Sequence, residues 1–238
     1  MKLNLNLTLA AAVLALANLA NAGDVTGAIT FKGTAPAEKE ITPIKEDPNC
    51  APLYPNGLPK TKFYVVGANG ELADVVVCLK DASGKEITGK STGASAAPAT
   101  LDQKGALYVP QILAMQTGQK LIVKNSDPLV HNVHTKPTAN PESNQVQMQG
   151  GPDLSYTFEK PEMFLKFQCD VHPWVFAWVS VFDNPYFSVS GTDGKFTIKN
   201  VPPGTYQIAV WNPKLKAAEQ SVTVAAGKPI EINFSIKR

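Results

Sequence analysis

The chain places all of its histidines close to one cysteine, in two short segments. Three histidines occur among 238 residues: His131 and His134 in LIVKNSDPLVHNVH, and His172 in FQCDVHPW, three residues after Cys169. Random scatter would rarely group them in this way. Two imidazole nitrogens and one thiolate sulfur form a trigonal donor set that suits copper, and such a set exchanges one electron readily. The spacing therefore predicts a site for one copper ion.

Particular elements must position these side chains. Cys169 ends a predicted strand and His172 begins the following turn, so the two converge across a tight loop, while His131 arrives from a neighbouring strand. His134 is the fourth candidate ligand. Residues i and i+3 of a regular strand face opposite sides, so His134 reaches the site only if a bulge or turn follows Val133; otherwise it is a surface or hydrogen-bonded histidine. The alternative is that His131 and His172 are core histidines with their hydrogen bonds satisfied, and that Cys169 is an inert buried thiol.

Short β-branched and aromatic runs recur between Gly, Pro, Asn and Asp clusters, which is typical of strands. So many strands at this spacing predict an antiparallel sandwich or barrel. The candidate strands are Val25–Phe31, Lys62–Val66, Val75–Lys80, Leu107–Val109, Lys120–Asn125, Val130–His134, Leu154–Glu159, Met163–Cys169, Trp174–Phe182, Lys195–Lys199, Tyr206–Trp211, Ser221–Val224 and Ile230–Ile236.

Three stretches are predicted to be loops because of their composition. They are Pro43 to Lys60, Asp81 to Gly105, and Thr135 to Asp153. The strand Trp174 to Phe182 is apolar on both parities, which is typical of a strand that is covered on both faces. We expect one face to pack in its own sandwich and the other against the C-terminal part of the chain.

Two motifs resemble the cupredoxins, the plastocyanin-like blue-copper proteins. One runs from Asn125-Ser126-Asp127 to His131-Asn132-Val133, and the other is Cys169-x-x-His172. The resemblance covers roughly residues 105–183 and implies that His131, Cys169 and His172 are copper ligands. A weak axial methionine usually follows the second histidine, but here the chain reads HPWVFAW. Met148 or Met163 could approach instead, or Val175 could leave the ion nearly three-coordinate.

The C-terminal part resembles the second half of a carboxypeptidase-regulatory-like, transthyretin-type β-sandwich. The turn signals Asp193-Gly194 and Pro202-Pro203-Gly204 carry this resemblance. Residues 25–33 and 71–80 resemble the missing first half. The predicted fold is therefore all-β: a cupredoxin-like Greek-key sandwich over residues 23–183, packed with a second, smaller β-sandwich over residues 184–238 that strands from residues 25–80 complete.

The first residues are typical of an export signal. Lys2 precedes a mostly apolar run, and Ala20-Asn21-Ala22 fits a small-x-small cleavage site, so we expect a signal peptide over residues 1–22 and a periplasmic or secreted protein. No later segment is long and apolar enough for a membrane span. An oxidising compartment favours disulfides, and we expect Cys50 and Cys78 to pair.

The composition narrows the function further. A net charge of +2 with a single arginine, Arg238, lacks the electrostatic footprint of a nucleic-acid binder. No Ser-His-Asp arrangement is legible, and we expect no enzymatic activity. The leading hypothesis is an exported copper protein that transfers one electron to or from an unidentified redox partner protein. The alternatives are copper storage or delivery, a structural zinc site, and a surface-binding or adhesion module without a redox role.

Overall fold

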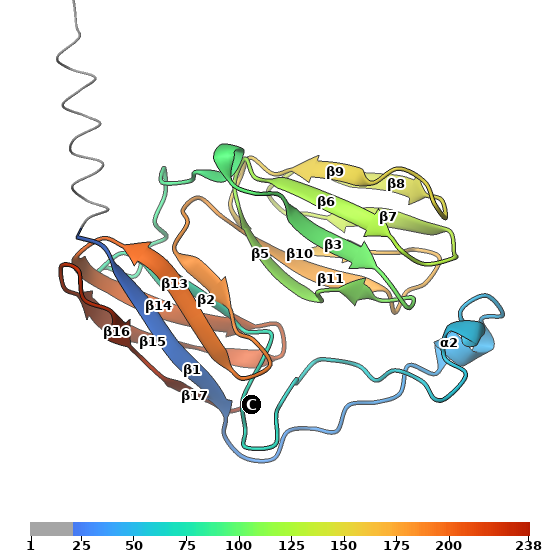
Figure 1. The fold of residues 1–238 in the computed structure, drawn as a ribbon, viewed down its shortest axis with the longest axis horizontal. Helices are drawn as coiled ribbons and strands as arrows, with labels where there is room; N and C mark the ends of the chain where they lie inside the picture. The colour runs from blue at the N-terminus through green and yellow to red at the C-terminus, as the bar shows by residue number, and fades with distance from the viewer. Residues whose placement is uncertain (1–20) are drawn as a thin grey trace, which may run out of the picture.

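The computed structural model describes residues 21–238, and their regular secondary structure is almost entirely β-strand (Figure 1). This confirms the all-β prediction. The helical segments of this part are short: α2 (Pro43–Glu46), η1 (Ala51–Leu53) and η2 (Gly93–Ser95). The strands are β1 (Gly23–Phe31), β2 (Val76–Lys80), β3 (Ala99–Gln103), β4 (Tyr108–Val109), β5 (Ile112–Gln116), β6 (Lys120–Asn125), β7 (His131–Lys136), β8 (Ser143–Gln147), β9 (Leu154–Thr157), β10 (Glu162–Gln168), β11 (Phe176–Phe182), β12 (Phe187–Val189), β13 (Lys195–Val201), β14 (Gly204–Asn212), β15 (Leu215–Val224), β16 (Ile230–Glu231) and β17 (Phe234–Ile236).

Two sheets form the first sandwich. One has the strand order β5-β11-β10-β7-β8 and the other the order β4-β3-β6-β9. Apolar side chains from both sheets meet between them, among them Leu121 and Val123 of β6 and Leu165 and Phe167 of β10. Neighbouring strands are often distant in sequence, as where β5 pairs in parallel with β11. Strand β10 pairs with β7 in the same sheet. His131 begins β7, and Cys169 follows the last residue of β10.

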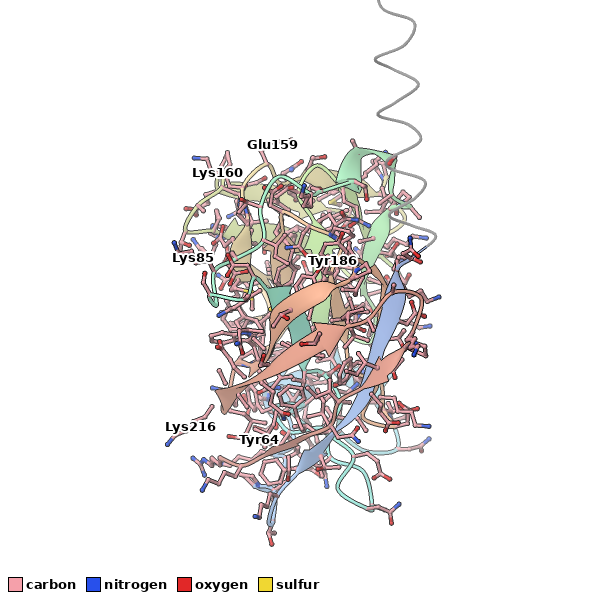
Figure 2. The ribbon with its side chains drawn as sticks, turned by 90° about the vertical axis from the view of Figure 1, so that its left-hand side faces the viewer. Tyr64, Lys85, Glu159, Lys160, Tyr186 and Lys216 are labelled. Atoms are coloured by element: carbon pink, nitrogen blue, oxygen red, sulfur yellow. The ribbon has the colours of Figure 1, made fainter. Side chains whose placement is uncertain are left out.

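The second sandwich combines strands from both ends of the chain. Its sheets have the orders β13-β1-β16, with β17 also on β1, and β12-β2-β14-β15. The N-terminal strand β1 pairs antiparallel with β13, and β2 pairs antiparallel with β14. In Figure 2, Glu159 and Lys160 of the first sandwich and Lys216 of the second lie toward opposite ends of the molecule.

The two sandwiches share an apolar interface. Val76 and Cys78 of β2 pack there against Ile112 of β5 and Phe182 of β11. On β11 the side chains of Ala177, Val179 and Val181 enter the first core, whereas Trp178 and Phe182 face the interface. The prediction that this strand is covered on both faces is confirmed.

Residues 32–75, which we call the arm, link β1 to β2 by a long detour. Figure 1 shows α2 at the far end of two extended limbs. The limbs run antiparallel and are joined by the backbone bonds from Ile41 N–H to the Pro59 carbonyl (2.9 Å) and from Thr61 N–H to the Lys39 carbonyl (2.8 Å). Ile41, Ile44 and Cys50 are buried in the core of the first sandwich. The arm therefore begins and ends in the second sandwich but is anchored on the first.

Several local predictions are wrong. Lys62–Val66 forms no strand beyond an isolated bridge at Val66, and the predicted loops at 81–105 and 135–153 contain β3 and β8. Strand β3 lacks a β-branched apolar run, yet Leu101 and Gln103 are buried because β3 lies between β4 and β6. The position of β3 between two other strands overrides the weak strand propensity of its own residues.

The predicted disulfide between Cys50 and Cys78 does not form. All three cysteines are free and buried. Cys50 lies in the core of the first sandwich, whereas Cys78 lies in the interface between the sandwiches. The two thiols thus belong to different packed clusters, a separation that the sequence does not reveal.

Most of the expected export signal, residues 1–20, lies outside the described residues. Within residues 21–238, none of the helices has the length and apolar character that crossing a bilayer requires.

Candidate metal centre

His131, Cys169 and His172 meet at one end of the first sandwich, and we call them the inner cluster. One donor atom from each lies within 4.8 Å of the others, and all three residues are buried. The Nδ1 atoms of His131 and His172 are 3.2 Å apart, and the Cys169 sulfur lies 3.6 Å from Nδ1 of His172. The strand-to-turn spacing thus brings these three predicted side chains together.

Strand pairing positions the sulfur. Strand β10 pairs antiparallel with β7, with Gln168 opposite His134. Cys169 follows directly, and its sulfur accepts a hydrogen bond from the backbone N–H of Asn132 at 3.5 Å. The side-chain oxygen of Asn132 accepts the Asp170 N–H at 2.7 Å. Asn132 therefore fixes the start of the ligand loop beside His131.

A tight loop then returns His172 to the sulfur. The backbone N–H of Cys169 donates to the Val175 carbonyl (2.9 Å), and the Val175 N–H donates to the His172 carbonyl (2.8 Å). These two bonds close a tight loop from Cys169 to Val175, and this loop contains His172. The indole of Trp174 packs on the His172 ring, with ring centroids 5.4 Å apart.

A buried carboxylate holds His131. The Asp127 Oδ2 atom lies 3.0 Å from His131 Nε2. Because a carboxylate only accepts, this contact places a proton on Nε2 and turns Nδ1 toward the inner cluster. Asp127 also accepts the backbone N–H groups of Gly105 and Ala106. The Gly105 carbonyl accepts the Tyr54 hydroxyl at 2.7 Å, so the arm braces the loop that holds the carboxylate.

The inner cluster favours a thiolate. Burial raises the pKa of the Cys169 thiol, but hydrogen bonds from His131 and the Asn132 N–H outweigh it, so the pKa lies below its ordinary value. Burial likewise lowers the pKa of His131, yet Asp127 and Cys169 hold that pKa above its ordinary value. Burial and the charge of His131 lower the pKa of His172. One proton therefore resides on His131, beside a negative sulfur and a neutral second imidazole.

His134, the fourth predicted residue, does not join the inner cluster. It lies on β7 and forms contacts with two carboxylates: Nδ1 is 2.7 Å from Asp170 and Nε2 is 2.6 Å from Glu142. Hydrogen bonds, from Gln168 first and then from His134 and Asn132, lower the pKa of Asp170 to about 2. His134 therefore supports the residue that follows Cys169, and the alternation of the strand turns it away from the cluster.

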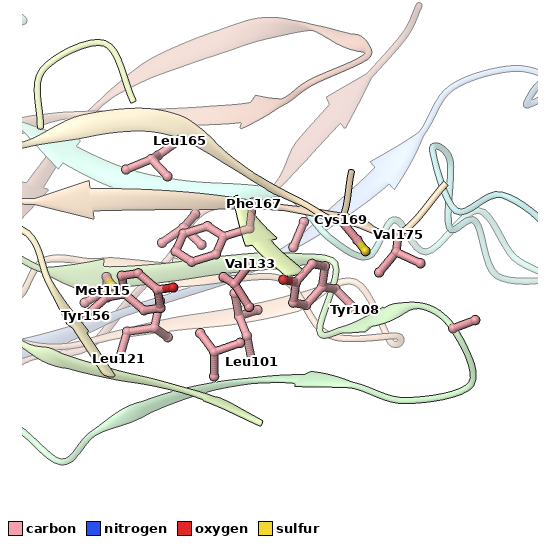
Figure 3. Close-up of a cluster of buried hydrophobic side chains, with 14 of the residues drawn as sticks. Leu101, Tyr108, Met115, Leu121, Val133, Tyr156, Leu165, Phe167, Cys169 and Val175 are labelled. Carbon is pink, nitrogen blue, oxygen red and sulfur yellow. The ribbon is translucent and has the colours of Figure 1, made fainter. Parts of the chain in front are cut away.

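The neighbourhood of the sulfur is apolar. Figure 3 shows the Cys169 sulfur beside Val175 at one end of the buried cluster. Val175 is fully buried. Met148 is exposed at the surface, and Met163 packs against the interface between the sandwiches. The residue three positions after His172 therefore supplies the inner cluster with methyl groups and no sulfur donor.

The donor set fits a copper ion. Bonds of about 2.0 Å to imidazole nitrogen and about 2.3 Å to thiolate sulfur separate donors by roughly 3–4 Å, and the separations of 3.2 and 3.6 Å agree with this. Two nitrogens and one sulfur with an apolar fourth neighbour match the trigonal set of blue-copper sites. The thiolate is already formed, and a bound metal would displace the proton that His131 holds.

A second chemical motif, Gly84 to Ser91, has no matching structure. GKEITGKS has the letters of a phosphate-binding loop, which requires a helix directly after the glycines. Here residues 84–91 lie in a loop, and the next helical element is the three-residue η2. The Gly89 N–H donates to the Asp183 carboxylate at 2.6 Å. A carboxylate thus takes the N–H that a phosphate would need.

Comparison with known proteins gives two kinds of likeness. Residues 177–232 match the family described as polysaccharide lyase family 4, domain II. The chain is 39% identical over 62 residues to a probable rhamnogalacturonate lyase A from Aspergillus clavatus, and this match spans 26% of the chain and 12% of the relative. The matched family is a lyase domain, so the predicted carboxypeptidase-regulatory-like tail is not confirmed.

Among solved structures, parts of the chain are similar to a cupredoxin, a copper-containing nitrite reductase and an amicyanin mutant. A purple cupredoxin from Nitrosopumilus maritimus is 23% identical, with a TM-score of 0.30, and the match covers 35% of this chain and 98% of that one. A copper-containing nitrite reductase from Thermus scotoductus is 17% identical (TM-score 0.33), with 43% and 27% covered. An oxidised amicyanin mutant is 18% identical (TM-score 0.33), with 39% and 89% covered.

The lyase match corrects one prediction. We expected from the sequence that the chain has no enzymatic activity. Residues 177–232 instead resemble a domain of a lyase family, and the matched relative is named as an enzyme. The expectation is therefore wrong as a statement about the chain. It rested on the lack of a legible catalytic arrangement in the sequence and took no account of the likeness of the C-terminal segment to a lyase domain.

Proposed function

We propose that the chain is an exported copper protein that exchanges one electron through His131, Cys169 and His172. The observation that carries this proposal is the convergence of one sulfur and two Nδ1 atoms in a buried, apolar place. A copper ion held there supplies a one-electron couple. Export is part of the proposal and draws on the signal-like residues 1–22.

The chain's own residues would keep this exchange fast. Cys169 is anchored by Asn132, and His131 is anchored by Asp127, so the donors change position little when the charge changes. Burial of all three side chains keeps water out, and the apolar Val175 adds no donor. A fixed, dry donor set reduces the reorganisation that electron exchange would otherwise require.

A redox partner would dock beside Trp174. This residue is in contact with His172 and is only partly buried. It lines a groove of about 310 Å³ between the arm and the first sandwich, together with Phe63 and Phe176. Lys39, Lys60 and Lys62 lie around the same groove. An apolar floor with basic residues suits brief docking of a partner with an acidic rim.

The test is a metal analysis and a visible spectrum of the purified protein. We expect one copper ion per chain, an intense visible band when the protein is oxidised, and loss of that band on reduction. Cys169→Ser should abolish the band, whereas Cys78→Ala, which alters a buried thiol in the distant interface, should retain it. A colourless oxidised copper protein, or an equal band in Cys169→Ser, would refute the proposal. Bound zinc without colour would favour a structural site.

A second candidate function, saccharide binding by the second sandwich, is favoured by the lyase match. A groove of about 550 Å³ is lined by Tyr186, Phe187, Lys90 and Lys199. Aromatic rings and lysines suit an acidic sugar chain, such as the rhamnogalacturonate in the relative's name. Affinity electrophoresis in rhamnogalacturonan should retard the protein, and Lys199→Gln should weaken the retardation more than Lys216→Gln. Equal mobility with and without the polysaccharide would exclude this function.

A further inference from the structure

The arm presents two more donor side chains to His172. Asp47, Cys50 and His172 each offer one donor atom within 4.8 Å of the others, and we call them the outer cluster. His172 thus belongs to both clusters. Its Nδ1 faces His131 and Cys169, whereas its Nε2 lies 3.7 Å from Oδ2 of Asp47. The proposed function uses the first of these faces and leaves the second unexplained.

The local fold fixes the outer cluster. Asp47 ends α2, and its Oδ1 accepts the backbone N–H groups of Asn49 (2.8 Å) and Cys50 (3.0 Å). This turn holds the thiol and the second carboxylate oxygen on the same side of the chain. Ile44 is fully buried in the core of the first sandwich, so α2 is pinned against it. Hydrogen bonds in the turn and the packing of α2 therefore hold the residues of the outer cluster in place.

The spacing within the outer cluster suits a shared ion better than a direct contact. A separation of 3.7 Å between His172 Nε2 and Asp47 Oδ2 is too long for a hydrogen bond. It agrees with two donors that are each about 2.0–2.2 Å from one cation. Thiolate and imidazole are ligands that suit a cuprous ion, and the Asp47 carboxylate offers a weaker oxygen donor beside them.

Exposure to solvent differs sharply between the two clusters. The Asp47 side chain is 25% exposed, whereas His172, Cys50, Cys169 and His131 are each 3% exposed or less. An ion that comes from solvent therefore meets Asp47 before any other donor. The arm covers the Nε2 edge of His172, so the approach to the inner cluster on this side passes the outer cluster.

We propose that Asp47, Cys50 and His172 form a loading site, which takes up cuprous ion from solvent and passes it to the inner cluster. This inference rests on the proposed copper function. Loading breaks the bonds to Cys50 and Asp47 and forms bonds to Cys169 and His131, and His172 exchanges Nε2 for Nδ1. The copper stays cuprous throughout. Binding at Cys50 releases the thiol proton to solvent, and the sulfur takes a proton back when the ion leaves it. The proton on the His131–Cys169 pair leaves to solvent, and the ring proton of His172 moves from Nδ1 to Nε2.

The first test removes the inner sulfur and counts the bound metal. Anaerobic titration with Cu(I) against a chromophoric chelator should show one tightly held ion in Cys169→Ser. The double variant Cys169→Ser/Cys50→Ser should lose this ion, whereas the matched double variant Cys169→Ser/Cys78→Ser should keep it. Equal binding by all three variants, or no binding by Cys169→Ser, would overturn the loading site. Circular dichroism of each variant checks that it is folded.

The second test follows the rate of loading. Asp47→Asn keeps an oxygen for the Asn49 and Cys50 N–H groups but loses the charge that meets the ion first. When Cu(I) is added and the protein is then oxidised at intervals, the visible band should appear about tenfold more slowly than in the wild type and reach the same intensity. Glu46→Gln, an exposed acid one residue away, should load at the wild-type rate. Equal rates for Asp47→Asn and the wild type would overturn the inference.

The two proposals fail in different ways. If the wild type never develops a visible band, the electron-transfer function fails whatever the outer cluster does. If the wild type develops the band but the Asp47 and Cys50 variants behave as their controls do, only the loading site fails.

Discussion

Asp127 Oδ2 lies 3.0 Å from Nε2 of His131, and both side chains are almost completely buried. A carboxylate in this position orients the imidazole and raises its basicity toward a metal. Asp127 also accepts two backbone N–H groups. The pair therefore joins the ligand strand β7 to the loop before β4, and the strength of the inner cluster should depend on it.

Asp127→Asn tests this dependence. An amide at this position is a weaker acceptor, and its NH₂ group faces the N–H groups that the carboxylate accepts. We expect the affinity for copper to fall by roughly 10–100-fold, measured by competition with a chelator. Asp153→Asn, at an exposed position, is the control and should bind as the wild type does. Undiminished affinity in Asp127→Asn would show that Asp127 does not position the ligand.

Val175→Met tests the apolar neighbour of the sulfur. A thioether donor at this position would stabilise the cupric form more than the valine methyl groups do, and the axial ligand is a known control of the potential at such sites. The reduction potential of the variant should be lower than that of the wild type in a spectroscopic redox titration. Val171→Met introduces the same side chain at an exposed position and should not change the potential. An unchanged or higher potential in Val175→Met would contradict the assignment.

Much of the inner cluster could be predicted from the sequence because its residues lie in short local motifs. Cys169 and His172 share one loop, and His131 lies on a strand that the sequence predicts. Asp127 is four residues before His131, in an N-x-D segment, but nothing in the sequence indicates its contact with the imidazole. His134 could be placed only by knowing that β7 continues regularly to Lys136 without a bulge.

The outer cluster could not be predicted in this way. Asp47 and Cys50 are more than 120 residues from His172, and they reach it only because the arm leaves one sandwich and packs on the other. Residues 43–60 read as a proline-rich loop, and Cys50 was assigned to a disulfide. Strand β3 could not be predicted for a similar reason, since its burial depends on β4 and β6 and not on its own sequence, ATLDQ. Long-range packing supplies what these segments lack locally.

Phe182→Ala tests the interface between the sandwiches. Phe182 is 3% exposed and stacks on Phe187 with ring centroids 4.9 Å apart. Its removal leaves a cavity between β11 and β12, and we expect the free energy of unfolding to fall by about 3–5 kcal/mol. Denaturant titration followed by circular dichroism measures the change, with Val146→Ala at an exposed position as the control. A loss below about 1 kcal/mol would mean that the ring is poorly packed.

Glu162 links the acid stability of the fold to one buried carboxylate. It begins β10, and its oxygens accept the N–H and hydroxyl of Thr138, the Ala139 N–H and the Asn140 amide. Burial alone raises the pKa of Glu162, but these hydrogen bonds outweigh burial and hold the pKa below its ordinary value. A lowered pKa in the folded state means that the carboxylate stabilises the protein above its unfolded pKa of about 4.3. This contribution is lost as the pH falls through the lower, folded pKa.

Glu162→Gln should therefore cost stability in a pH-dependent way. At pH 7 we expect a loss of roughly 1.5–3 kcal/mol, because hydrogen bonds to a charged group are replaced by weaker ones to an amide that also brings unwanted donors. Thermal unfolding at several pH values should show the gap between the variant and the wild type narrowing below about pH 4. Glu159→Gln, at an exposed position three residues earlier, should show no such gap. A gap that stays constant from pH 7 to pH 3 would mean that the charge of Glu162 contributes nothing, because only the ionised carboxylate loses stabilising energy on acidification.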